Sequence, residues 1–165
     1  MAANVRKLGK LLDTVFMAIC ILLLAVIIVA SSLQVFTRYI MGNAVTGTEE
    51  LGRYCFIWMS MLGGSICVGK WLHPSISILT DALGPGMRRI SDVVLNILIA
   101  VVAGVLLAKG GSMVLLTTRQ LSSVLRIPMC FVYLGVPLGA FGMGYHAVEN
   151  LVAALHGGKG KEEPA

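Results

Sequence analysis

Apolar residues dominate four long stretches of the chain, and shorter polar stretches separate them. The first has no charged residue from 14 to 37, and the second has none from 54 to 69. A helix needs about 20 residues, each rising about 1.5 Å, to cross a hydrocarbon core about 30 Å thick. The pattern therefore predicts four transmembrane helices, which we place at about residues 13–38, 50–70, 90–117 and 128–153.

The polar turn between the first two stretches carries most of the candidate functional residues. Arg38 precedes the turn, Glu49, Glu50 and Arg53 follow it, and Trp58 lies just beyond. Glu49 and Arg53 are spaced to pair on one helix face, in the favourable order. Carboxylates at a helix N-terminus also complement its positive end. These five residues are candidates for contacts with a partner subunit or for fixing the turn.

The third and fourth stretches contain residues that are unusual at membrane depth. An ionisable residue inside a span, here Lys109, is a hypothesis of function by default. It is near enough to the end of the span to extend toward the interface, so anchoring or a subunit contact is the alternative to ion or substrate coupling. Gly135 and Gly139 form a G-x-x-x-G pair suited to close helix packing, and Pro137 predicts a kink.

The longest connection lies between the second and third predicted helices. Its residues 74–84 mix apolar and polar side chains, which predicts either an amphipathic helix lying in the membrane interface or a plain loop. Ser91 and Asp92 are the expected N-terminal cap of the third helix. Residues 157–165 are rich in glycine and charge, and we expect a disordered cytoplasmic tail.

Composition assigns the chain to the integral membrane proteins. Of its 165 residues, 57% are hydrophobic and 13% are charged, and the mean hydropathy is +0.88. An ordinary soluble domain carries roughly 25% charged residues. The four spans occupy most of the chain, so we expect residues 1–156 to form a single all-α transmembrane domain without a catalytic ectodomain.

The formal charge of +5 is explained better by membrane orientation than by nucleic acid, because the basic residues lie in small groups beside apolar stretches. With four crossings, both termini lie on one side of the membrane. With Lys109 left out, that side carries eight basic residues and the opposite side four, so the positive-inside rule places both termini in the cytoplasm. The eight are Arg6, Lys7, Lys10, Lys70, Arg88, Arg89, Lys159 and Lys161, and the four are Arg38, Arg53, Arg119 and Arg126.

The cysteines and histidines do not indicate a cofactor or an enzyme. Cys20, Cys55, Cys67 and Cys130 all lie in apolar stretches, and none forms a C-x-x-C pair, so no zinc site or redox pair is predicted. We expect all four to be small buried hydrophobic residues. A haem-binding bundle needs histidines facing one another, and only His146 lies in a predicted span. We therefore expect no metal, no cofactor and no enzymatic activity.

Two stretches carry a family resemblance. QVFTRYIMGNAVTGTEELGRYCFIW, residues 34–58, and SSVLRIPMCFVYLGVPLG, residues 122–139, resemble the small membrane subunit of tripartite ATP-independent periplasmic (TRAP) transporters. Further matches extend the resemblance along most of the chain. Three positions depart from it: Gly47 stands where the family commonly has tryptophan, Ala44 where it has proline, and Ser77 where it has an acid.

The resemblance implies a non-catalytic scaffold subunit of a sodium-coupled secondary active importer of organic acids, in the bacterial inner membrane. Such a subunit is expected to form a heterodimer with a large membrane subunit, which carries the solute and sodium sites, and to be surrounded by membrane lipid. A periplasmic substrate-binding protein delivers the solute, and the small subunit braces the stationary part of the large one. The sequence agrees, since it lacks the inverted repeat and discontinuous helices with which transporters build a midplane site.

Two alternatives belong to other classes. The chain could be an accessory or signalling subunit of another membrane complex. A small multidrug-type antiporter would have similar dimensions, but it needs a membrane-embedded acid in its first helix. Residues 14–37 contain none, which disfavours this second alternative.

Overall fold

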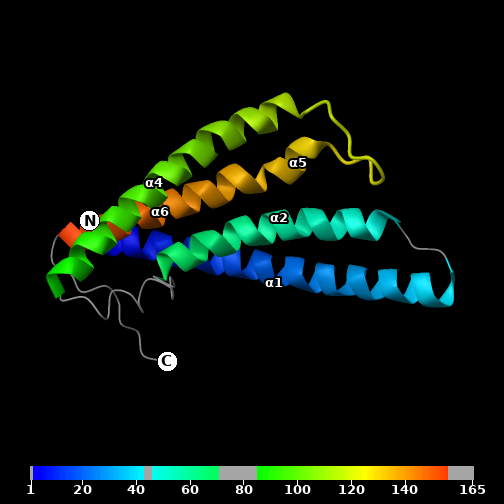
Figure 1. The fold of residues 1–165 in the computed structure, drawn as a ribbon, viewed down its shortest axis with the longest axis horizontal. Coiled ribbons are helices and arrows are strands. Elements are labelled where there is room, and N and C mark those ends of the chain that lie inside the picture. Colours follow the sequence, from blue (N-terminus) through cyan, green and yellow to red (C-terminus); the bar gives the residue numbers. More distant parts are fainter. Residues whose placement is uncertain (1, 43–45, 71–84, 156–165) are drawn as a thin grey trace.

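The computed structural model describes residues 2–42, 46–70 and 85–155 of the chain. Within them it has the helices α1 (Ala2–Ile40), α2 (Thr46–Gly69), α4 (Pro85–Leu116), α5 (Met129–Tyr133) and α6 (Gly135–Leu155), shown in Figure 1. The described residues contain no β-strand, only an isolated bridge. The predicted interfacial segment 74–84 and the predicted tail 157–165 lie outside the described residues.

Within the described residues, four stretches are long and apolar enough to cross a membrane, which confirms the predicted all-α class with four spans. They are Leu8–Ile40, Thr46–Gly69, Ile90–Leu116 and Met129–Ala154, the last made of α5 and α6 together. The start of α1 and the end of α6 lie at the same end of the molecule (Figure 1). An even number of crossings explains this arrangement.

Helix α4 begins earlier than the sequence predicts. Pro85 is its first residue, where a missing N–H costs nothing because no helical acceptor would face it. Ser91 and Asp92 therefore lie inside the helix, and the prediction that they cap its N-terminus is wrong. The Asp92 carbonyl instead accepts a hydrogen bond from Asn96 Nδ2 at 2.8 Å.

The long helices pack as an open row. Helix α1 packs on α2, α2 packs on α6, and α6 packs on α4, whereas α1 and α4 make no contact within the described residues. The buried core is small and comprises Phe16, Leu62 and Ile66, with Trp58 packed against it. Many large apolar side chains of α1 and α4 are exposed, as expected for helices that face lipid or another membrane protein.

Glycines let α6 approach α2 closely. A Cβ atom added at Gly139 would lie 2.6 Å from the carbonyl oxygen of Met61, and one at Gly135 would lie 3.0 Å from the Trp58 ring. Both positions of the predicted G-x-x-x-G pair thus face α2. The contact holds backbone against backbone, which leaves no room for a side chain at Gly139.

The α6–α4 contact uses a different pattern. Asn96, Ala103, Gly110 and Thr117 recur every seven residues along α4, and each is buried. A Cβ atom at Gly110 would lie 3.0 Å from the Val136 side chain. A period of seven keeps one narrow stripe of a helix facing its neighbour.

The last membrane span is interrupted near its start. Helix α5 ends at Tyr133, and α6 begins at Gly135. Pro137 has no N–H to donate to the Tyr133 carbonyl four residues earlier, so the regular series of helical hydrogen bonds is interrupted there. The predicted effect of Pro137 thus takes the form of a break at Leu134.

The cysteines are less uniformly buried than predicted. Cys55 is buried, Cys20 and Cys130 are half-buried, and Cys67 is exposed. The expectation of four buried cysteines is wrong because the open row leaves large parts of the helix surfaces uncovered by protein.

We predict that Gly139→Ala destabilises the protein by about 1–3 kcal/mol, because the new methyl group would overlap the α2 backbone. Thermal unfolding in detergent measures the effect. Gly104→Ala on α4 is the matched control, since nothing lies within 4 Å of a Cβ atom there. An equal change in the two variants would contradict the prediction.

Candidate functional site

The most connected polar group of the described residues is the carboxylate of Glu50, in the first turns of α2. Its Oε2 atom accepts hydrogen bonds from the backbone N–H groups of Leu125 at 2.9 Å and Val124 at 3.1 Å. Its Oε1 atom accepts from the Ser123 N–H at 3.2 Å and from the Tyr54 hydroxyl at 2.6 Å. We call this set of five residues the Glu50 clamp.

The loop held by the Glu50 clamp folds as a short hairpin between α4 and α5. The Ser122 N–H donates to the Ile127 carbonyl at 2.9 Å, and the Met129 N–H donates to the Gln120 carbonyl at 2.8 Å. Arg126 completes the turn with φ of 54°, a left-handed conformation that is uncommon for a residue other than glycine. The hairpin turns three consecutive N–H groups toward one carboxylate.

The chemistry of the loop explains why a carboxylate stands there. Successive N–H groups that point the same way form a concave site for an anion. Outside a helix these groups need an acceptor, and hydrogen bonds to an ionised carboxylate are stronger than those to a neutral oxygen. Glu50 therefore joins the start of α2 to a loop more than 70 residues away. In Figure 1 this loop lies at the same end of the molecule as the end of α1 and the start of α2.

The other charged residues of the predicted set are arranged differently. Glu49 and Arg53 form the ion pair that their spacing predicts, at 3.1 Å, but both side chains are mostly exposed. Such a surface pair contributes little to stability. Arg38 is exposed at the end of α1 and makes no ion pair with a described residue. The structure thus brings Glu49 and Arg53 together, and leaves Arg38 apart.

Trp58 lies between α2 and the broken span. Its Nε1–H group donates to the Phe131 carbonyl at 3.1 Å, and its ring covers Gly135. Trp58 is half-buried, and this bond gives its N–H group an acceptor. Trp58 thus extends the contact that the Glu50 clamp makes between α2 and the segment after α4.

Lys109 is separate from all of these residues. It is exposed on α4 and has no ion pair with any residue that the structure describes. Its position on an outer helix leaves it available to a partner or to the membrane interface.

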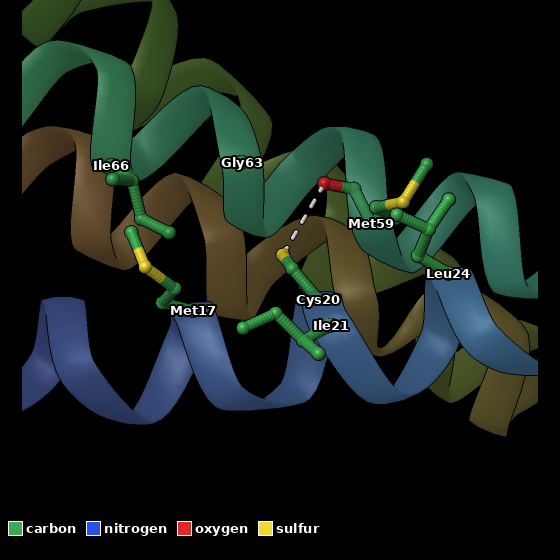
Figure 2. A pocket seen from close by; sticks show the side chains of 7 residues that line it. All are labelled: Met17, Cys20, Ile21, Leu24, Met59, Gly63 and Ile66. Carbon is green, nitrogen blue, oxygen red and sulfur yellow. Dashed lines mark hydrogen bonds between the residues drawn. The ribbon is translucent and has the colours of Figure 1, made fainter.

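A shallow groove of about 240 Å³ lies between α1 and α2 (Figure 2). Its polar contact is weak, since the Cys20 thiol lies 3.8 Å from the Met59 carbonyl. No charged side chain lines the groove, so it offers nothing to bind an organic anion. The lining residues are Met17, Cys20, Ile21, Leu24, Met59, Gly63 and Ile66.

Sequence reasoning missed two groups of residues. The loop partners of Glu50 carry no local signal, because the loop is far from Glu50 in the chain. Tyr54 had a local one, since it lies four residues after Glu50 on the same helix. Asp13 and His146 were also missed, although they lie 3.0 Å apart between α1 and α6. The sequence did offer a hint of this contact: Asp13 is an acid at the start of the first span, and His146 is a histidine inside the last one.

Together, the fold and these contacts define a small all-α integral membrane protein whose polar groups tie its own helices to one another. The model of the family described as "Tripartite ATP-independent periplasmic transporters, DctQ component" matches residues 27–157. The chain therefore belongs to the DctQ family, which is a transporter component rather than an enzyme family.

Individual relatives agree with this family. A Haemophilus influenzae protein named as a candidate TRAP transporter small permease is 31% identical over 80 residues, 48% of this chain and 50% of the relative. The chain thus aligns with half the length of that relative. A second such protein from the same organism is 27% identical over 135 residues, 81% of each chain. The Haemophilus influenzae sialic acid TRAP transporter permease protein SiaT is 29% identical over 98 residues, 59% of this chain and 15% of the relative.

We predict that Glu50→Ala releases the loop at Ser123–Leu125, because three N–H groups lose their acceptor. Amide hydrogen exchange of these three residues should accelerate several-fold, and Glu50→Gln, which keeps one carbonyl oxygen, should have a smaller effect. Glu49→Ala is the matched control, since among the described residues the Glu49 carboxylate bonds the exposed Arg53 and none of the loop N–H groups. Unchanged exchange in Glu50→Ala would show that the clamp does not order the loop.

Proposed function

We propose that the chain is the non-catalytic scaffold subunit of a TRAP-type, sodium-coupled secondary active importer of organic acids. In this role it braces the large transport subunit in the bacterial inner membrane, with both termini in the cytoplasm. A periplasmic substrate-binding protein delivers the solute to the assembled complex. Family membership establishes a TRAP-type component, and the remaining points are inferred.

The observation that carries the proposal is the open row of helices. The two outer helices, α1 and α4, are each packed mainly on one neighbour and expose apolar side chains along most of their length. The polar contacts of the Glu50 clamp join residues of this chain to one another. A stiff body with broad apolar outer surfaces suits a brace, whereas a transport subunit needs a polar site for its solute.

A relative supports a large subunit as the partner. In the sialic acid TRAP transporter permease protein SiaT, the match to this chain covers only 15% of the length. The region similar to this chain is therefore part of a much longer polypeptide there. We infer that the present chain forms a heterodimer with a separate large subunit that corresponds to the remainder.

The substrate class rests on the same relative and on the family resemblance. Sialic acid, in the name of SiaT, is a carboxylic acid, which supports organic acids as the imported class. The groove between α1 and α2 has no charged lining, so we place the solute site and the sodium sites on the large subunit.

The candidate contact residues follow from exposure. Arg38 and Lys109 are exposed cations without an ion pair to a described residue of this chain. A cation near the membrane is stabilised by a carboxylate, a carbonyl or a lipid phosphate. We propose that Lys109 contacts the large subunit and that Arg38, with Glu49 and Arg53, contributes to the same complex at the α1–α2 end.

We expect the tagged chain, purified in mild detergent, to bring down one larger multi-spanning protein in a one-to-one ratio. Sodium-dependent solute uptake into liposomes should require both proteins together with the binding protein. Mass spectrometry and an uptake assay measure these outcomes. Uptake by the purified chain alone would refute the assignment of roles.

We predict that Lys109→Gln lowers the amount of large subunit that co-purifies, because the variant loses a charge at the proposed contact. Lys70→Gln is the control, since Lys70 is also an exposed lysine but lies at the end of α2. Equal recovery with Lys109→Gln and with the unmodified chain would exclude Lys109 from the interface.

A further inference from the structure

The side chain of His146 lies where three helices meet. His146 is on α6 and is only 3% exposed. Its Nε2 atom is 3.0 Å from Asp13 Oδ1 on α1, and its Nδ1 atom is 3.8 Å from Glu149 Oε2 on α6. On the α2 side, a Cβ atom added at Gly69 would lie 3.0 Å from the ring. The imidazole therefore fills a space that a larger residue at Gly69 would close.

The two ring nitrogens face different carboxylates. A neutral imidazole has one N–H donor and one nitrogen lone pair, whereas the protonated ring has two donors. Ionised carboxylates can only accept, so only the protonated ring offers a donor to both Asp13 and Glu149. Asp13 Oδ1 and His146 Nε2 are buried and neither has a hydrogen bond with any described group, so their 3.0 Å approach is a charge contact that supplies no hydrogen bond as it stands. The protonation state of the ring thus decides whether the α1–α6 contact is attractive.

The surrounding groups do not replace this interaction. Tyr145 lies edge-on to the imidazole, with ring centroids 5.6 Å apart, and Lys10 and Lys70 at the nearby ends of α1 and α2 are exposed. Helix α4, the other helix packed on α6, buries the uncharged Asn96 and Ala103. Asp13 and Glu149 are therefore the acidic groups that the structure sets against the ring.

We propose that Asp13, His146 and Glu149 form a pH-sensitive latch, which fastens the first part of α1 to α6. Histidine ordinarily changes charge between about pH 5 and 8, while aspartate and glutamate stay ionised there. At pH values below this range, the protonated ring lies between the two carboxylates and attracts both. As the pH rises, one nitrogen loses its proton and its lone pair faces a carboxylate. The contact weakens, and α1 is then held chiefly by α2. This latch does not depend on the proposed scaffold function.

The test is the thermal unfolding of the full chain in detergent, at about pH 5.5 and about pH 8. Because the latch is lost as the pH rises, the unmodified chain should unfold at a temperature about 3 °C or more lower at the higher pH. His146→Gln should remove this difference. His73→Gln and His156→Gln, which change the other two histidines, should retain it. A difference of the same size in His146→Gln would overturn the proposal.

A second measurement covers the case in which His146→Gln does not fold. In the chain labelled with ¹⁵N-histidine, the resonances of His146 are assigned by their absence from a His146→Phe or His146→Gln sample, or by sequential connectivity in the unmodified chain. Nuclear magnetic resonance then reports whether both ring nitrogens carry protons at about pH 6. Two protonated nitrogens that titrate to one between this pH and about pH 8 support the latch. A neutral ring at the lower pH would refute it.

Discussion

The Glu50 carboxylate accepts hydrogen bonds from backbone N–H groups of a distant loop. The position of α1 and α2 relative to the segment from α4 to α6 depends on this interaction. Backbone N–H groups outside a helix need an acceptor. Here one side chain of α2 accepts three of them from the loop between α4 and α5, with Tyr54 bonded to the same carboxylate. The start of α2 and the loop after α4 are thereby kept at one end of the protein (Figure 1).

Polar contacts at the opposite end hold the same two central helices. Asn150 Nδ2 on α6 donates to the Val68 carbonyl at 3.0 Å, one of the last carbonyls of α2, which no residue of its own helix can reach. His146 lies one turn away and adds α1 to this contact. Between the two ends, the glycines of α6 bring its backbone against α2. Since apolar side chains alone give helices little preference over lipid, these close and polar contacts are what specify the pairing.

The row of helices that results has consequences for function. Because α2 and α6 occupy the middle, α1 and α4 are left with broad outer surfaces that no other described helix covers. A chain built in this way is joined along its centre by close and polar contacts and is apolar on its flanks. Apolar outer surfaces of this kind agree with membership of the DctQ family of membrane transporter components.

The sequence by itself determined the class, the four spans, the glycine pair and the Glu49–Arg53 ion pair, because each follows from hydropathy or from spacing within one helix. It also indicated an effect of Pro137 and singled out Glu50. Only the tertiary structure decided which loop Glu50 bonds and how His146 is placed, since both depend on segments that folding brings together from distant parts of the chain. The start of α4 was misjudged because Ser91 and Asp92 are typical caps, while the preceding residues also form helix. Spacing describes neighbours along one helix, whereas contacts between helices depend on which faces pack.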